Sequence, residues 1–262
     1  DRMIIKCVNG YMFFTFENLY KAYKDGKSAW CEMINGTNRD ECRYWINEMG
    51  GLQIYAAGIP LLFDNQLDVM SKKDQKIARQ FFRKNEDGGA YLRITEFEND
   101  IIFRCPAQMQ LQLHAANGGK AYNYFWTYPS EFKNLGACHA VELNHVFNNL
   151  DERIYTGNNV NEKLADEVQN MWVNFARNGN PSTKENEWPV YNGNSKKTLI
   201  LGEKIFVKEN LFSRRSSLVE PLLKYMINGS YSVLKLNTPY IRVLLGVLLA
   251  IGLIIAIIIN VL

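Results

Sequence analysis

Residues 243–259 form an uninterrupted apolar run, VLLGVLLAIGLIIAIII, near the end of the 262-residue chain. At ~1.5 Å per residue a helix over this run is about 26 Å long, near the lower end of what spans a ~30 Å hydrocarbon core. The run is apolar on every face, whereas a helix packed on a soluble core keeps a polar stripe. We therefore expect residues 237–262 to be a single C-terminal membrane anchor; a buried core helix or a subunit contact is the alternative.

The charges that flank this run indicate an orientation. Lys224, Lys235 and Arg242 precede it, and no lysine or arginine follows it. The positive-inside rule then favours a globular body on the cytoplasmic side. The side of the membrane stays open, because an N-terminal export signal could precede Asp1.

Composition narrows the function classes for the rest of the chain. The 30 Lys+Arg against 27 Asp+Glu give a formal charge of +3, too little for the basic surface that nucleic-acid binding requires. No repeat or proline-rich linker divides residues 1–236, which we read as one unit. The five cysteines form no C-x-x-C pair, so reduced and mostly buried thiols are expected, with one disulfide possible. No metal or cofactor site is predicted.

Strand and helix patterns alternate along this unit. Residues 29–35 are strand-like and end at Gly36, and residues 121–128 are an aromatic, strand-like run. Residues 71–83 read as a helix, and residues 162–178 read as another. The alternation predicts an α/β sheet domain.

The helix over residues 162–178 has the clearest pattern. Asn161 can cap its start, and Gly179 with Pro181 can stop it. Its apolar residues recur at helical spacing and are expected to pack in the core rather than bind a ligand: Leu164, Val168, Met171, Trp172 and Phe175.

Two short segments contain candidate catalytic residues. His139 is one of only three histidines, with His114 and His145, and it follows the small residues Gly136 and Ala137. A structural loop histidine is the alternative, and His139, His145 and Cys138 match no common zinc spacing.

The second segment, residues 36–43, follows the first predicted strand and contains Asp40 and Glu41. Active sites of α/β sheets gather at the carboxyl ends of their strands. A solvated turn, in which Asp40 and Glu41 pair with Arg39 or Arg43, is the alternative.

Together with the chain that follows them, these segments resemble the carboxylesterase type B family, the cholinesterase-like serine esterases of the α/β-hydrolase fold. Residues 29–43 look like the family's strand and its I-G-T-N-x-D-E-G turn. Residues 103–128 resemble the next helix and strand, and residues 136–147 are similar to its G-A-x-H-x-x-E-L-x-x-V-F turn. Residues 161–189 match its C-terminal helix and W-P element.

The resemblance implies the C-terminal portion of an α/β-hydrolase fold, a mixed and mostly parallel sheet flanked by helices, within residues 1–236. It implies that His139 is the general base and Glu41 the acid of a catalytic triad, in the α/β-hydrolase order. Cys42 stands where the family has Gly. No G-x-S-x-G occurs in the sequence, and Gly26-Lys27-Ser28 is the nearest fragment.

The missing motif suggests that Asp1 is an internal position of a longer esterase whose N-terminal half carries the serine and the oxyanion hole. The expected function is then hydrolysis of a small-molecule ester through an acyl-enzyme, with the 262 residues inactive alone. A membrane-tethered, non-catalytic binding protein of the same fold is the alternative. The aromatic residues of 121–128 could line a substrate pocket, although core packing is the expected role of most of them.

Overall fold

The structure is a computed structural model that describes residues 16–44, 67–83 and 95–231, with Gly246, Leu249 and Ile251. No helix within those residues is both long and apolar enough to cross a membrane. The predicted anchor over residues 237–262 lies outside the described residues, apart from the three isolated positions. The anchor therefore stays a prediction.

The described secondary structure follows the chain in this order. The elements are α1 (Phe16–Lys24), β1 (Met33–Asn38), α4 (Lys72–Arg83), the π-helix η1 (Asn99–Arg104), α6 (Cys105–Ala116), β2 (Ala121–Trp126), α7 (Leu143–Val146), α8 (Glu162–Asn178), β3 (Thr198–Leu201), β4 (Phe206–Lys208), α9 (Ser213–Val219), the 3-10 helix η2 (Glu220–Leu222) and α10 (Leu223–Ile227).

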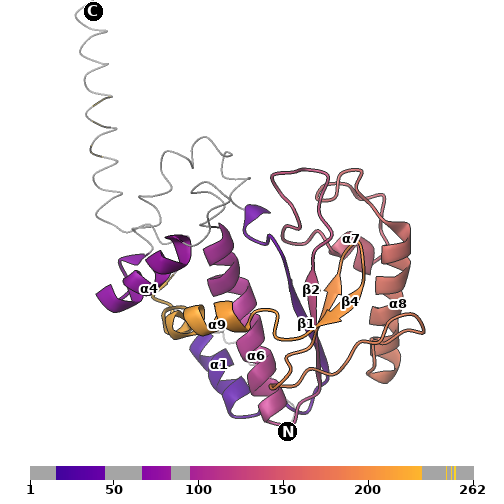
Figure 1. Ribbon diagram of the computed structural model, residues 1–262, viewed down its shortest axis with the longest axis horizontal. Helices are drawn as coiled ribbons and strands as arrows, with labels where there is room; N and C mark the ends of the chain where they lie inside the picture. Colours follow the sequence, from indigo (N-terminus) through magenta and orange to yellow (C-terminus); the bar gives the residue numbers. More distant parts are fainter. Residues whose placement is uncertain are drawn as a thin grey trace, which may run out of the picture.

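The strands form one sheet in the order β1-β2-β3-β4. β1 pairs with β2, and β2 with β3, in parallel, and β4 is an antiparallel partner of β3. Parallel neighbours need crossover connections, and α6 lies on one face of the sheet while α7 and α8 lie on the other (Figure 1). The predicted mixed, mostly parallel α/β sheet is confirmed.

The first predicted strand is wrong in its bounds. The sequence pattern predicts residues 29–35 with an end at Gly36, whereas β1 begins at Met33 and continues through Gly36 to Asn38. A Cβ at Gly36 would collide with the ring of Tyr124 on β2. This glycine is required by close approach of a neighbouring strand rather than by a turn.

Side chains of β2 alternate between the two helical layers. Tyr122 and Trp126 lie in the core shared with α8, while Ala121 packs with Leu111 of α6. Burial on both faces explains why this strand reads as a continuous aromatic and small-residue run. The predicted strand is confirmed, and it ends two residues earlier than expected, at Trp126.

Helix α8 begins and ends at the predicted residues. The Asn161 side chain accepts a hydrogen bond from Leu164 N at 3.1 Å, which satisfies a backbone donor of the first turn. Gly179 ends the helix in the left-handed conformation, with φ of 70°. Val168 and Met171 are buried on the side that faces the sheet.

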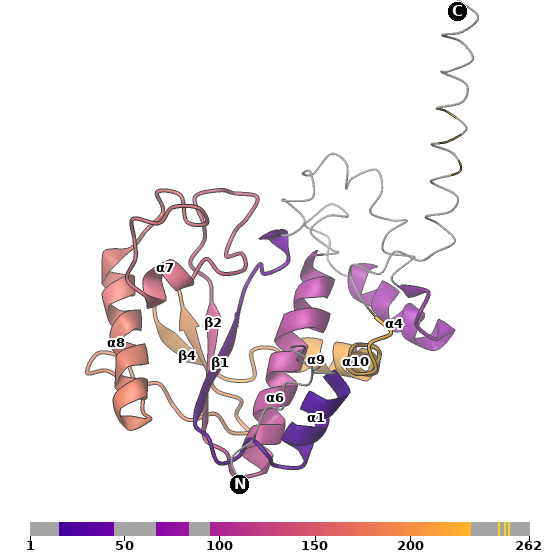
Figure 2. The same cartoon turned by 180° about the vertical axis from the view of Figure 1, so that it is seen from behind.

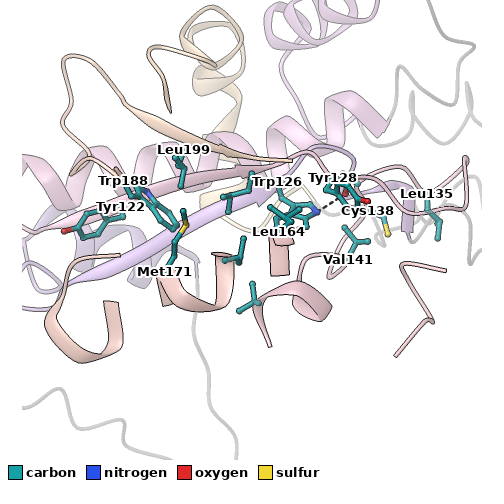
Figure 3. Close-up of a cluster of buried hydrophobic side chains, with 14 residues drawn as sticks. Tyr122, Trp126, Tyr128, Leu135, Cys138, Val141, Leu164, Met171, Trp188 and Leu199 are labelled. Carbon is teal, nitrogen blue, oxygen red and sulfur yellow. Dashed lines mark hydrogen bonds between the residues drawn. The ribbon is translucent and has the colours of Figure 1, made fainter. Parts of the chain in front are cut away.

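The main apolar core fills the space between α8 and the sheet (Figure 3). Its aromatic members also satisfy their polar atoms: Trp126 Nε1 donates to Tyr128 O at 2.9 Å, and Trp188 Nε1 donates to Asn123 O at 3.1 Å. Most of the aromatic residues of 121–128 therefore pack in the core, as expected. The labelled members of the cluster are Tyr122, Trp126, Tyr128, Leu135, Cys138, Val141, Leu164, Met171, Trp188 and Leu199.

A second apolar cluster joins α4, η1, α9, η2 and α10 on the α6 side of the molecule (Figure 2). The predicted helix over residues 71–83 is α4, and Ser71 caps it: Ser71 Oγ accepts from Asp74 N at 3.2 Å. The buried residues of the cluster are Leu67, Met70, Ala78, Phe97, Ile101, Cys105, Val219, Leu222, Leu223 and Tyr231.

Candidate active site

The turn after β1 carries Asp40 and Glu41 and is called the acidic turn. Contacts with the sheet and with η1 fix its position. Arg39 N donates to Trp126 O at 2.9 Å, which continues the pairing of β1 with β2. Cys42 N donates to the Asn99 side chain at 2.7 Å, and Asn99 Nδ2 donates back to Arg39 O at 3.2 Å. Cys42, the departure from the family's glycine, is buried and leaves these contacts in place. The acidic turn is thus rigidly positioned at the carboxyl end of the strand.

Asp40 joins this turn to the segment that carries His139. Its buried carboxylate lies 3.0 Å from Arg39 Nε and 3.0 Å from Arg43 Nη2, and it accepts from Ala137 N at 2.9 Å. Gly136 is in the left-handed conformation, and a Cβ there would collide with the Asp40 carboxylate. The ion pairs of the alternative interpretation form at Asp40, which pairs with both arginines, but Asp40 is buried and the turn is not the solvated one of that alternative.

Glu41 has a different partner. Its Oε2 lies 2.7 Å from His139 Nδ1, across a separation of 98 residues. Its Oε1 accepts from Asn38 N at 2.7 Å, and His139 N donates to Glu41 O at 3.3 Å. Both carboxylate oxygens are therefore directed by hydrogen bonds, and the structure brings the two predicted site residues together.

The two side chains differ in exposure in the way that acid–histidine chemistry needs. The Glu41 side chain is 6% exposed and the His139 side chain 43% exposed. A buried carboxylate at Nδ1 fixes the ring orientation and stabilises a protonated imidazole, while the exposed part of the ring can meet a reactant. The Phe103 ring packs beside the imidazole, with centroids 5.5 Å apart.

Charges and burial shift the pKa values around this pair. The hydrogen bond with Glu41 raises the pKa of His139, burial opposes this, and the Glu142 carboxylate adds a smaller upward contribution. Burial raises the pKa of Glu142. Burial also raises the pKa of the Cys138 thiol to about 12, so that thiol stays protonated and unreactive beside His139.

Sequence reasoning assigned no role to Asn38, whose backbone N–H bonds Glu41, or to Glu142, which bonds the Asn38 side chain. Asn38 Nδ2 donates to Cys138 O at 2.8 Å and to Glu142 Oε2. Both residues lie inside the two motifs that single out Glu41 and His139, and this proximity is the only signal the sequence offers for them.

A buried ion-pair network behind the acidic turn was also missed. Arg104 donates to Asp100 at 3.0 Å and to Glu96 at 3.1 Å, and it also bonds Arg39 O. Arg215 of α9 pairs with Asp100 at 2.7 Å. Because removal of one partner from a buried pair is costly, this network holds η1 against the acidic turn.

His145 and Ser28 do not join the site. His145 is buried, lies between Trp126 and Tyr128, and accepts weakly from Asn161 N at 3.4 Å. Burial lowers its pKa to about 4, so it is neutral and structural.

Ser28, the nearest sequence fragment to a nucleophile elbow, precedes β1, whereas Glu41 follows it. Its Oγ lies 3.1 Å from Nδ1 of the buried His114. Ser28 is thus at the other end of the strand from His139 and is not its partner.

An apolar groove of about 300 Å³ runs along β1 between α1, α6 and α10. Phe103 lines the groove and also contacts His139, so the groove reaches the edge of the site. Its other walls include Tyr23, Met109 and Ile227.

The sequence model of the Carboxylesterase family matches residues 17–219. The chain belongs to this family. Among curated proteins it is 28% identical over 210 residues to para-nitrobenzyl esterase of Bacillus subtilis (strain 168), covering 77% of this chain and 40% of that protein. It is 32% identical over 177 residues to liver carboxylesterase 1F of Rattus norvegicus, covering 60% of this chain and 31% of that protein.

Solved structures of carboxylesterase family members carry the same fold. A para-nitrobenzyl esterase structure aligns with a TM-score of 0.59 and 23% identity over 76% of this chain and 40% of its own. A carboxylesterase of Geobacillus stearothermophilus aligns with a TM-score of 0.60 and 22% identity over 76% and 42%. The α/β-hydrolase fold is therefore confirmed, and the chain spans between 31% and 42% of the length of these relatives.

Proposed function

We propose that the chain supplies the acid and the histidine of a serine-type carboxylic ester hydrolase, with the nucleophilic serine carried by polypeptide upstream of Asp1. The observation that carries the proposal is the 2.7 Å contact between Glu41 Oε2 and His139 Nδ1. Family membership supports the reaction class, and the lack of any G-x-S-x-G in the 262 residues supports an external serine.

In this mechanism His139 is the general base. Its Nδ1 faces Glu41, so Nε2 is the atom that takes the proton of the serine as the serine attacks the ester carbonyl. His139 then returns the proton to the leaving alcohol. In the second half-reaction it takes a proton from the water that attacks the acyl-enzyme, and it gives this proton to the serine oxygen as the bond to the acyl group breaks and the acid is released. Glu41 holds the ring and stabilises the imidazolium without itself becoming protonated.

Oxyanion stabilisation comes from backbone N–H groups that lie outside this chain in the proposal. The 262 residues alone are therefore inactive. Esters are the proposed substrates as a class, and the apolar groove that reaches Phe103 supports an apolar group on one side of the ester bond.

Labelling with a fluorophosphonate tests the proposal. The 262-residue chain is expected to take up no label, whereas the longer polypeptide is expected to be labelled at a serine upstream of Asp1. Labelling of a serine within the 262 residues contradicts the proposal. An upstream segment with Gly or Ala in place of the serine supports the non-catalytic binding protein instead.

Membrane attachment through residues 243–259 is the second part of the proposal, supported by the length and composition of the run. The body then lies on the cytoplasmic side. The full chain is expected to stay with membranes after alkaline carbonate extraction, and a chain truncated after residue 236 to be released. Release of both chains contradicts the anchor, and protection of the body from protease added outside sealed vesicles contradicts its side.

A further inference from the structure

Two carboxylates, rather than one, converge on the residue that ends β1. The backbone N–H of Asn38 donates to Glu41 Oε1 at 2.7 Å, and the side-chain amide of the same residue donates to Glu142 Oε2. That amide also donates to Cys138 O at 2.8 Å, the carbonyl directly before His139. One buried residue therefore fixes both carboxylates relative to the histidine.

Glu142 is held by the sheet, although it lies three residues after His139. Its Oε2 accepts from the side chain of Asn38, the last residue of β1. The charge of Glu142 also reaches the hydroxyl of Tyr124, in the middle of β2, where it adds to burial, the largest cause of that tyrosine's raised pKa. A partly buried carboxylate held by a buried donor is more constrained than a surface glutamate.

The backbone next to His139 is shaped to bring Glu142 back toward the site. Ala140 has a φ of 66°, in the left-handed region that costs a non-glycine residue roughly 1 kcal/mol. The turn that follows is closed by hydrogen bonds from Val141 N to Cys138 O and from Leu143 N to Ala140 O, at 3.3 and 3.2 Å. This strained turn reverses the chain so that Glu142 returns to Asn38.

We propose that Glu142 is a positioning residue for His139: held by Asn38, its carboxylate acts with Glu41 to stabilise the protonated imidazole. Its role in ester hydrolysis rests on the proposed function, whereas its effect on the imidazole does not. During proton transfer a second negative charge lowers the energy of the imidazolium formed when the serine attacks.

The other groups that the structure describes around the imidazole do not replace this charge. From η1 the neighbour is the apolar ring of Phe103. From the acidic turn, Asp40 is neutralised by Arg39 and Arg43. Among the described residues, Glu41 and Glu142 are therefore the carboxylates whose charge acts on the ring.

Titration of His139 tests the inference on the full 262-residue chain in detergent solution, by NMR of ¹³C,¹⁵N-labelled histidine with His139 assigned from the His139→Gln spectrum. Glu142→Gln keeps the shape of the side chain and removes its charge, so the His139 midpoint is expected to fall by on the order of half a pH unit. Glu142→Asp keeps the charge and is expected to stay closer to the wild type.

Glu32→Gln is the matched control, because Glu32 is an exposed carboxylate that precedes β1, at the end opposite Glu41. A His139 midpoint in Glu142→Gln that moves no further than in Glu32→Gln overturns the inference. That result leaves the proposed esterase function standing, since the readout involves no catalysis.

Discussion

Asp40 and Ala137 exchange two hydrogen bonds across a gap of 97 residues: Asp40 N donates to Ala137 O at 2.9 Å, and Ala137 N donates to the Asp40 carboxylate at 2.9 Å. This pairing joins the turn after β1 to the segment after β2. The residues that follow on each side are Glu41 and, two positions on, His139. The separation between acid and histidine is therefore set by backbone contacts rather than by the two side chains alone.

Gly136→Ala is expected to destabilise this junction. The φ of +57° at Gly136 disfavours any side chain, and a Cβ would collide with the Asp40 carboxylate. We expect the free energy of unfolding to fall by about 2 kcal/mol, measured by urea denaturation. Gly193→Ala is the control, because a Cβ there meets no atom within 4 Å. Equal free energies of unfolding for the two variants would show that the junction between Gly136 and Asp40 does not stabilise the fold.

Acid stability is expected to depend on His145. Burial lowers its pKa to about 4 from an ordinary value of 6.5, so the unfolded chain binds more protons between these values. Neutral His145 makes its full contribution to the free energy of unfolding above pH 6.5. About 3 kcal/mol of that free energy is lost as the pH falls from 6.5 through about 4.

The His145 effect is measured by urea denaturation from pH 7 to 4, with His145→Phe as the comparison. The variant keeps a ring between Trp126 and Tyr128 but cannot titrate, so its stability should vary less with pH. The raised pKa of His139 has the opposite effect, because it favours folding at low pH. Both proteins contain His139, so its effect cancels in the comparison. An unchanged pH slope in His145→Phe would contradict the assignment.

Thiol reactivity is expected to separate the described cysteines. Cys31 is partly exposed, whereas Cys42, Cys105 and Cys138 are buried and all four are free. Burial raises the pKa of Cys105 and Cys138 to about 12. In the native protein, iodoacetamide should therefore modify Cys31 first, as read by peptide mass spectrometry, and the buried thiols only in denaturant. Alkylation of Cys138 as fast as Cys31 would contradict the burial of the histidine segment.

Asn161→Ala is expected to lower the free energy of unfolding by about 1 kcal/mol, because the cap of α8 loses its bond from Leu164 N. Asn161→Asp retains an acceptor and should remain close to the wild type in the same urea denaturation. If both variants lose equal stability, the side-chain acceptor is not the cause.

Local signals explain which parts of the fold the sequence predicts. Helix α8 is correct at both ends because its apolar spacing, the Asn161 cap and the Gly179 stop all lie within the segment itself. The bounds of β1 differ from the predicted ones because Gly36 is needed for close approach of the Tyr124 ring on β2, not for a turn. No local sequence pattern contains that contact. The reduced, buried state expected for most cysteines is confirmed for those described, and Cys7 lies outside the described residues.

The candidate site likewise has parts that the sequence predicts and parts that depend on contacts between distant segments. The 98-residue separation of Glu41 and His139 shows no periodicity, and only the family resemblance linked them before the structure. The partners Asn38 and Glu142 depend on the parallel pairing of β1 with β2, which brings the turns after both strands to the same edge. Composition and spacing carry no information on that pairing, so these contacts could not be predicted.

The Glu41–His139 assignment is tested most directly by ester hydrolysis, measured on the longer polypeptide of the proposal, in which these residues join an upstream serine. With a short-chain nitrophenyl ester, His139→Ala is expected to lower kcat by about 10⁴- to 10⁶-fold and Glu41→Gln by about 10⁴-fold. Glu32→Gln, which removes an exposed carboxylate before β1, should keep normal turnover. Near-normal kcat in a folded His139→Ala variant would contradict the assignment.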